Sequence, residues 1–352
     1  MSTIGLVSED QLSRLIAQIA QKAMVVPGMV LPFVDYDEFL PDLLRQCRFS
    51  SDRLISGGHL SPDVAIAADR ASLRVEEILG ISPFTGNVDD IRSRLDSPSA
   101  LVYVANPNRV TGAGFSLKDL EMLADMVYEG TLIVDEYYFD YYGISAVPLL
   151  HTHSNVVILR SFTASFGISS SNAGYVIAPA ALVRRLRDVT ANPTLSQTVY
   201  RMLTAAMENE SALSHRLTGL HNEALRLAGE LTRLGIQNRL SPTDFLLLRV
   251  GDVKSTGNFL AKAKVPIHNL DGYPQLEHCL RYHLQSELSN NQLLGAFRRM
   301  PEEFYRLRGA DRRAVTLRRS GETAPVVVSA VEPVFERNQV SIATRQSADV
   351  VK

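Results

Sequence analysis

Three apolar runs lie between Leu101 and Tyr175, and they constrain the fold more than any other part of the sequence. Each run ends in small or polar residues, in the segments LVYVANPNRVTG, TLIVDEYYFDYYG and ILRSFTASFGISSSNAGY. In an open parallel sheet, buried strands are almost continuously apolar, and the loops at their carboxyl ends carry ligand-binding residues. The stretch therefore predicts three buried strands whose loops meet at one edge of a sheet and form a platform for a cofactor.

The flanking segments alternate between helical and strand patterns. The predicted helices cover residues 8–26, 37–47, 63–72 and 87–95, and the predicted strands cover 53–56 and 74–79. Pro41 is expected in the first turn of its helix, where a missing N–H is tolerated. This alternation predicts a doubly wound α/β layer.

The later part of the chain predicts a second set of elements. Residues 193–229 read as long helical sequence, and 293–305 as a closing helix, with strands at 245–250 and 280–284. The long helical sequence offers an apolar face made of Leu213, Leu217, Leu220, Leu225 and Leu227.

Composition narrows the class of protein. The 352 residues are 45% hydrophobic and 21% charged, which is typical of a soluble globular protein of two domains. A net charge of -2 gives no reason to expect a nucleic-acid partner or an anionic membrane. Cys47 and Cys279 lie far apart, form no metal-ligand pattern and are expected to be buried thiols in a reducing compartment. No apolar run approaches the roughly 18 residues of a membrane span, so we expect a cytoplasmic protein.

Several motifs in this sequence occur in the order and spacing of a known family. They are NPNRVTG, DEYY, SFTASFG and NAGY, followed by ANPTLSQ, DFLLLRV and GYPQLEHCLRYHL. Over roughly residues 8–300 the chain resembles the fold type I pyridoxal-phosphate aminotransferases, most closely the histidinol-phosphate aminotransferase branch. The resemblance implies a three-layer α/β large domain with a mostly parallel sheet and a smaller α+β domain. We expect an N-terminal helix in residues 1–30, the large domain in 31–205, the small domain in 206–307 and an extension in 308–352.

Some residues of the chain match functional positions of that family. By the resemblance, Asp135 matches the aspartate that salt-bridges the pyridine nitrogen, and Tyr138 matches the tyrosine that bonds the phenolic oxygen of the cofactor. Ser161 and Thr163 match hydroxyls that hold the phosphate, and Arg281 matches the arginine that clamps the anionic end of the substrate. Purely structural roles stay open, because an Asp-Glu pair after a strand can cap a helix and a serine can satisfy a turn.

Other positions depart from the family pattern. Ala164 stands where the Schiff-base lysine is expected, and Asn172 where an arginine grips the phosphate. Arg109 stands where an asparagine bonds the phenolic oxygen, so it could bind another anion or salt-bridge Asp135. The glycine- and serine-rich turn that cradles the phosphate is replaced by FVDYDE at residues 33–38, where bulky side chains and an added carboxylate oppose phosphate binding.

These matches and departures lead to three hypotheses. The first is a non-catalytic homologue (a pseudoenzyme) that binds neither cofactor nor metal and acts as a binding, partner or regulatory protein. The second is an active transaminase of the histidinol-phosphate type, which would use pyridoxal phosphate to transfer an amino group to 2-oxoglutarate in histidine biosynthesis. The third is cofactor-independent acid–base chemistry by Asp135, Tyr138 and Arg109.

The expected partners follow from the same comparison of motifs. The family analogy predicts a homodimer, or a heterodimer with an aminotransferase-like subunit. Arg281 and Arg109 predict a site for a small anionic ligand.

Two further segments carry weaker signals. His278 and His283 flank Arg281, and strand alternation predicts that they are ordinary surface residues on different faces. The tail RRAVTLRRSGETAPVVVS weakly resembles the opening strands of imidazoleglycerol-phosphate dehydratase, without that family's histidine clusters. It is either the remnant of a neighbouring gene or a solvated basic extension.

Overall fold

The computed structural model describes residues 6–48, 52–166, 172–190 and 195–307. Residues 1–306 form one compact unit and residues 307–352 a second. The expectations for the tail after residue 307, and for the start of the helical sequence at residues 193–194, lie outside the described residues. The domain boundaries given above remain predictions.

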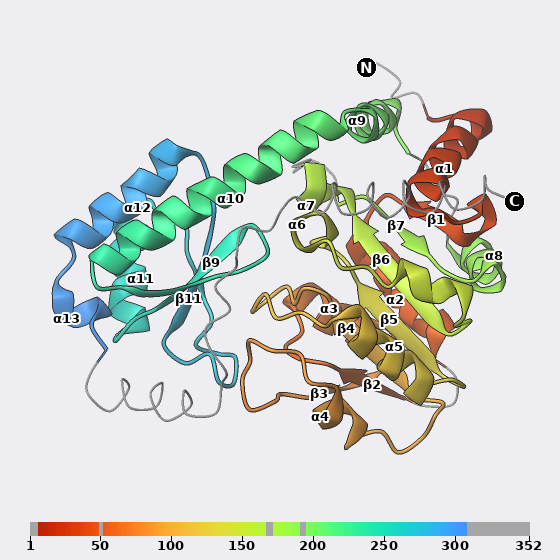
Figure 1. Cartoon of the computed structure of the whole chain (residues 1–352), viewed down its shortest axis with the longest axis horizontal. Coiled ribbons are helices and arrows are strands. Elements are labelled where there is room, and N and C mark those ends of the chain that lie inside the picture. Colours follow the sequence, from red (N-terminus) through yellow and green to blue (C-terminus); the bar gives the residue numbers. More distant parts are fainter. Residues whose placement is uncertain (1–5, 49–51, 167–171, 191–194, 308–352) are drawn as a thin grey trace, which may run out of the picture. The chain divides into compact units, whose positions relative to one another are not determined.

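The larger of two sheets has seven strands in the order β1-β7-β6-β5-β4-β2-β3 (Figure 1). The strands are β1 Val30–Phe33, β2 Arg53–Ser56, β3 Arg74–Glu77, β4 Leu101–Ala105, β5 Thr131–Asp135, β6 Val156–Ser161 and β7 Gly174–Ile177. Strands β2 to β6 pair in parallel, and β7 runs antiparallel between β6 and β1. The three apolar runs form β4, β5 and β6 as predicted, and Asp135 pairs in register with Ala105 and Leu159.

Helices cover both faces of this sheet. On one face, α2 (Tyr36–Cys47), α3 (Pro62–Arg70) and α8 (Ala180–Val189) share a buried cluster with β4, β5 and β6. On the other face, α4 (Val88–Arg92) and α5 (Leu117–Met126) close a second cluster. Helix α1 (Glu9–Ala23) packs with β1 and α9 (Gln197–Glu208). The predicted three-layer α/β architecture is therefore confirmed.

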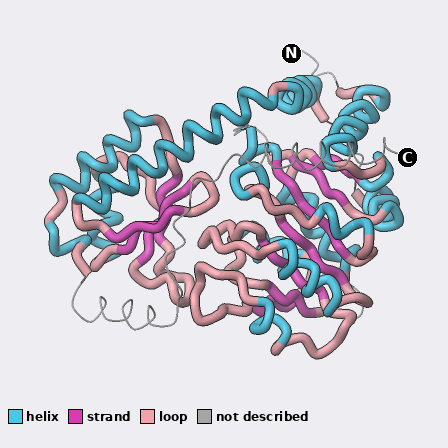
Figure 2. The backbone as a smooth tube through the Cα atoms, viewed as in Figure 1, coloured by secondary structure: helices cyan, strands magenta, loops and turns pink. Residues whose placement is uncertain are grey.

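The smaller sheet is antiparallel, with the order β10-β11-β9-β8 (Figure 2). Its strands are β8 Gln237–Leu240, β9 Phe245–Arg249, β10 His268–Asn269 and β11 Cys279–His283. Its core is shared with the helices α10 Glu210–Arg233, α11 Val253–Lys262, α12 Glu287–Arg299 and α13 Glu302–Tyr305.

Three helix predictions need correction. Helix α2 begins at Tyr36, so Pro41 lies inside the helix instead of in its first turn. The ring removes the N–H that would bond to the carbonyl of Asp37. That carbonyl accepts a hydrogen bond from Arg70 Nη1 at 3.1 Å, which compensates for the loss.

The other two corrections concern the C-terminal helices. The closing helix is two helices, because Met300 takes an extended conformation before Pro301. The long helical sequence is divided at Asn209, whose side chain caps α10. Of its five predicted apolar-face leucines only Leu227 is buried, and Leu225 is 47% exposed.

Candidate functional site

Asp135 ends β5 and is fully buried. Its Oδ2 accepts hydrogen bonds from the hydroxyls of Tyr36 at 2.8 Å and Tyr103 at 2.5 Å. Its Oδ1 accepts the backbone N–H of Tyr137 at 3.0 Å. Arg109 Nη1 lies 3.7 Å from Oδ2, so the salt bridge between Arg109 and Asp135, one of the two predicted alternatives, is present. All of these partners belong to the same chain.

Arg109 is held by more than Asp135. Its Nη1 lies 2.7 Å from Asp63 Oδ2, and its guanidinium lies 4.1 Å from the centroid of the Tyr137 ring and 5.1 Å from that of Tyr36. Only 15% of the side chain is exposed. A guanidinium between two carboxylates and two aromatic faces is stabilised by charge and by cation–π contact.

Burial and charge act in opposite directions on the two carboxyl groups. Burial raises the pKa of Asp135 above its ordinary value, although Arg109 and the two tyrosine hydroxyls oppose this shift. Burial also tends to raise the pKa of Asp63, but the charge of Arg109 outweighs it, and the pKa of Asp63 is lowered. The charge of Arg109 is thus shared unequally between Asp63 and Asp135.

The segment 33–38, predicted to replace the phosphate-binding turn, joins β1 to α2. Asp35 is the N-cap of α2, and its Oδ1 accepts the backbone N–H groups of Asp37 at 2.8 Å and Glu38 at 3.3 Å. The backbone N–H of Tyr36 donates to the carbonyl of Asn172 at 2.9 Å. Amides at a helix N-terminus attract anions, and here a carboxylate of the chain itself occupies them.

Tyr138 is nearly buried, and its hydroxyl hydrogen-bonds Asp244, which also lies 3.1 Å from His283 Nδ1. The prediction that His283 is an ordinary surface histidine is therefore wrong. The pairing arises because Asp244 and His283 lie at adjacent ends of β9 and β11. His278 precedes β11 with a positive φ of 70°, so strand alternation does not apply to it, and its Nδ1 lies 3.2 Å from the carbonyl of Gly251.

Ser161, Thr163 and Ala164 lie where β6 passes into the short helix α7 (Phe162–Phe166). Ser161 Oγ accepts the backbone N–H of Thr163 at 3.0 Å, which is the turn role left open above. Ala164 is buried in an apolar cluster with residues of both sheets, namely Val110, Tyr138, Phe245, Leu247, Leu270, Leu276 and Cys279. The position predicted to match the lysine thus has apolar surroundings.

Arg281, the predicted anion clamp, lies on β11. Its Nη1 donates to the carbonyl of Arg109 at 2.7 Å, and its guanidinium lies 5.3 Å from the centroid of the Phe245 ring. Its Nε is buried, and no hydrogen-bond partner for it is found among residues 6–48, 52–166, 172–190 and 195–307. The structure therefore brings the two predicted anion-binding arginines together.

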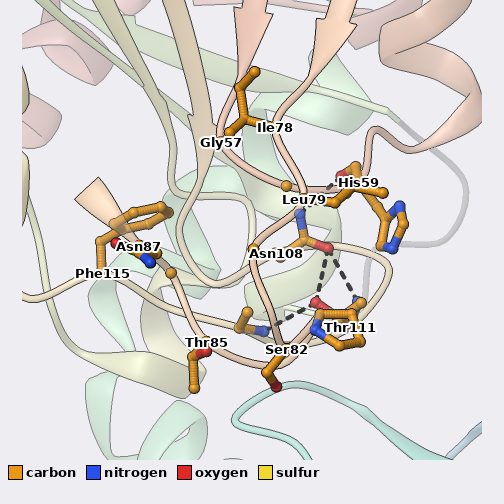
Figure 3. A pocket seen from close by; sticks show the side chains of 15 residues that line it. Gly57, His59, Ile78, Leu79, Ser82, Thr85, Asn87, Asn108, Thr111 and Phe115 are labelled. Carbon is orange, nitrogen blue, oxygen red and sulfur yellow. Dashed lines mark hydrogen bonds between the residues drawn. The ribbon is translucent and has the colours of Figure 1, made fainter. Parts of the chain in front are cut away.

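A small cavity lies at the carboxyl ends of β2, β3 and β4, away from Asp135 (Figure 3). Its lining comes from residues 57–59, 78–87 and 108–115 and includes the buried His59. The connections from β2 and β4 run in opposite directions along the sheet, so the cavity marks a topological switch point. Its volume of about 20 Å³ has room for about one water molecule. The lining includes none of the predicted site residues.

Sequence reasoning missed four residues of the site: Tyr36, Tyr103, Asp63 and Asp244. A signal existed for Tyr103, because it shares the sheet face of Ala105, which pairs with Asp135. The long-range contacts of the other three leave no comparable signal in the sequence.

Two general searches cover only the described part of the chain. No group of three histidine, cysteine or acidic side chains there is arranged to hold a metal ion. No helix there is both long enough and apolar enough to cross a bilayer.

Comparison with known proteins agrees with the predicted resemblance. A family model described as aminotransferase class I and II matches residues 59–293. The histidinol-phosphate aminotransferase of Caldanaerobacter subterraneus subsp. tengcongensis is 28% identical over 199 residues, which is 56% of each chain. That of Chlorobium luteolum is 29% identical over 202 residues, again 56% of each chain. The chain thus spans a little over half the length of these curated relatives.

A solved structure extends the likeness to the whole fold. The histidinol-phosphate aminotransferase from Clostridium acetobutylicum superposes with a TM-score of 0.75, covering 83% of this chain and 89% of that one. Its sequence identity is 17%, so the likeness is one of fold.

Proposed function

Because the chain belongs to the class I and II aminotransferase family, we propose that it is a non-catalytic member that keeps the family fold and acts as a binding, partner or regulatory protein. One observation carries the proposal. The carboxylate of Asp135 is fully buried and already bonded by Tyr36, Tyr103 and Arg109 of the same chain.

The residues of this chain do not fit pyridoxal phosphate. The cofactor would need the Asp135 carboxylate for its ring nitrogen, but that carboxylate is enclosed by internal donors. It would need acceptor-free amides for its phosphate, but Asp35 caps the start of α2. The Tyr138 hydroxyl bonds Asp244, and Ala164 offers no amine. Each contact that the family makes with the cofactor thus has an internal partner or no reactive group.

The proposal includes a ligand and an assembly. The ligand is a small anion at Arg281, supported by the unpartnered, buried Nε within the described residues and by the nearby Arg109. The assembly is a dimer, either of two copies or with an aminotransferase-like subunit, in the cytoplasm. Support for the dimer is the family fold.

Trapping with borohydride tests the proposal. The purified chain is mixed with pyridoxal phosphate, reduced, digested and searched by mass spectrometry for a pyridoxyl-lysine. An active histidinol-phosphate aminotransferase serves as the control. We expect the modified peptide in the control alone. A stoichiometric adduct on one lysine of this chain would overturn the proposal.

The names of the curated relatives favour a second candidate, an active transaminase of the histidinol-phosphate type. Assaying amino transfer from histidinol phosphate to 2-oxoglutarate tests it directly. The variant Ala164→Lys/Asn172→Arg sharpens the comparison, because it restores the two missing family residues. We expect no turnover from it, since Asp35 and Tyr36 still occupy the start of α2. Measurable turnover would favour the second candidate.

Cofactor-independent acid–base chemistry gains no support. Asp135 and Tyr138 are buried, and Arg109 is largely so. Their polar groups bond one another, Asp63 or Asp244.

A further inference from the structure

We propose that Tyr36 is a built-in occupant of a latent ring-binding site above Asp135, and that removing its side chain re-opens the site for a free aromatic ring carrying one hydrogen-bond donor. This inference rests on the proposed function, because it explains what fills the site instead of an external ligand. It turns the closed site from a simple loss of contacts into an exchange of ligands.

Three contacts fix Tyr36 in this position. Its hydroxyl donates to Asp135 Oδ2 at 2.8 Å, and its backbone N–H donates to the carbonyl of Asn172 at 2.9 Å. It is the first residue of α2, directly after the N-cap Asp35. Its side chain is 2% exposed. The ring is therefore held at both ends, by its hydroxyl and by its backbone.

The surroundings of the ring are those of an aromatic-binding pocket. The ring of Tyr36 meets Phe33 and Tyr137 edge to face, with centroid distances of 6.0 Å and 6.3 Å. The guanidinium of Arg109 lies 5.1 Å from its centroid. Aromatic rings favour such edge-to-face and cation–π neighbours.

The bottom of the pocket is polar and carries a fixed direction. Asp135 Oδ2 also accepts the Tyr103 hydroxyl at 2.5 Å and faces Arg109 at 3.7 Å. If the Tyr36 ring is removed, the carboxylate loses one of its two hydroxyl donors while remaining buried. An unpaired buried acceptor is costly, so the opened cavity favours a ring whose donor reaches Asp135.

The variant Tyr36→Ala tests this idea with two probes of similar size. The probe p-cresol carries the ring and the hydroxyl of a tyrosine side chain, whereas toluene carries the ring alone. Apolar cavities left by truncation can bind free aromatic molecules. At millimolar concentration we expect p-cresol to raise the Tm of Tyr36→Ala by roughly 2–5 °C, and toluene by clearly less.

A cavity in the same helix provides the control. Leu40 of α2 is fully buried in the same cluster, but no carboxylate is among its cluster neighbours. In Leu40→Ala we expect toluene to raise Tm at least as much as p-cresol. Equal responses to the two probes in Tyr36→Ala, or no response to either, would overturn the proposal.

A double-mutant cycle keeps the proposal testable if Tyr36→Ala does not fold. The cycle combines Tyr36→Phe, which keeps the ring, with Asp135→Asn. We expect the two changes in the unfolding constant to be coupled by roughly fivefold or more. Coupling within experimental error would contradict the role given to the hydroxyl. Borohydride trapping in the unmodified chain tests the proposed function separately, so either idea can fail alone.

Discussion

At the scale of single residues, two neighbouring carboxylates are buried on opposite faces of the large sheet. Asp135 contacts Tyr36, Tyr103 and Arg109 on one face. Glu136 accepts Arg160 Nε at 2.8 Å on the other face, with further hydrogen bonds from Ser145 and Ala146. Burial raises the pKa of both groups. Each is stable only because its partners are fixed in place.

Replacing Asp135 by asparagine tests that dependence. The change keeps the shape of the side chain but removes the negative charge that faces Arg109 at 3.7 Å. We expect the free energy of unfolding in urea to fall by about 2–4 kcal/mol. Asp125→Asn is the matched control, because Asp125 is 70% exposed and pairs with His153. It should change stability by less than about 0.5 kcal/mol.

The pair of Asp244 and His283 predicts a dependence of stability on pH. Burial alone would raise the pKa of Asp244, but hydrogen bonds from His283 and Tyr138 outweigh it and lower that pKa. A carboxyl group with a lowered folded-state pKa stabilises the protein above its unfolded pKa of about 3.9, and this contribution is lost as pH falls through the folded value. Asp244→Asn should therefore cost more stability at pH 6 than at pH 3. Urea unfolding at both pH values checks this, and an equal cost would contradict it.

At the scale of elements, the start of α2 depends on Asp35. Its Oδ1 accepts two backbone N–H groups that would otherwise lack intrahelical partners. Asp35→Ala should lower the free energy of unfolding by about 1 kcal/mol, whereas Asp35→Asn should stay near the unmodified protein because asparagine caps as well. Thermal unfolding of the two variants side by side makes the measurement. Equal losses in both would assign the effect to charge instead of capping.

The same elements show what local sequence can and cannot predict. The helix at 37–47 was predicted one residue short, and its proline was placed too early, because capping by Asp35 rather than the apolar pattern sets the first residue. The break at Pro301 follows from backbone chemistry and was missed for a helix predicted from apolar spacing alone.

At the scale of the whole compact unit, the two sheets share one apolar cluster. Val110, Tyr138 and Ala164 come from the large-sheet side, and Phe245 and Leu247 from β9. The loop after β4 also contacts the turn before β9. Gly112 has a φ of 73°, and a Cβ there would overlap Ser241.

This shared cluster predicts that the two sheets unfold together. Hydrogen exchange followed by mass spectrometry in rising urea should give one midpoint for peptides of β4–β6 and of β9–β11. Ala164→Lys places an amine in the cluster and should lower both midpoints, whereas Ala164→Met should lower them less because it adds length without charge. Two separate midpoints in the unmodified chain would contradict the prediction.

The sequence by itself determined the layers, the order of strands β4 to β6 and the place of Asp135 at the end of β5. It could do so because apolar runs and their polar ends are local patterns that a sheet edge collects in one place. It also identified Arg109 as a candidate partner of Asp135, while leaving another anion as the alternative.

Only the tertiary structure decided what the Asp135 carboxylate bonds to. Tyr36 lies 99 residues away in the chain and Tyr103 lies 32 residues away, yet both hydroxyls reach the same oxygen. Such contacts depend on how α2 packs against the sheet and on the direction of each side chain, which local patterns do not encode. The fold could therefore be predicted from sequence, whereas the closed state of its central site could not.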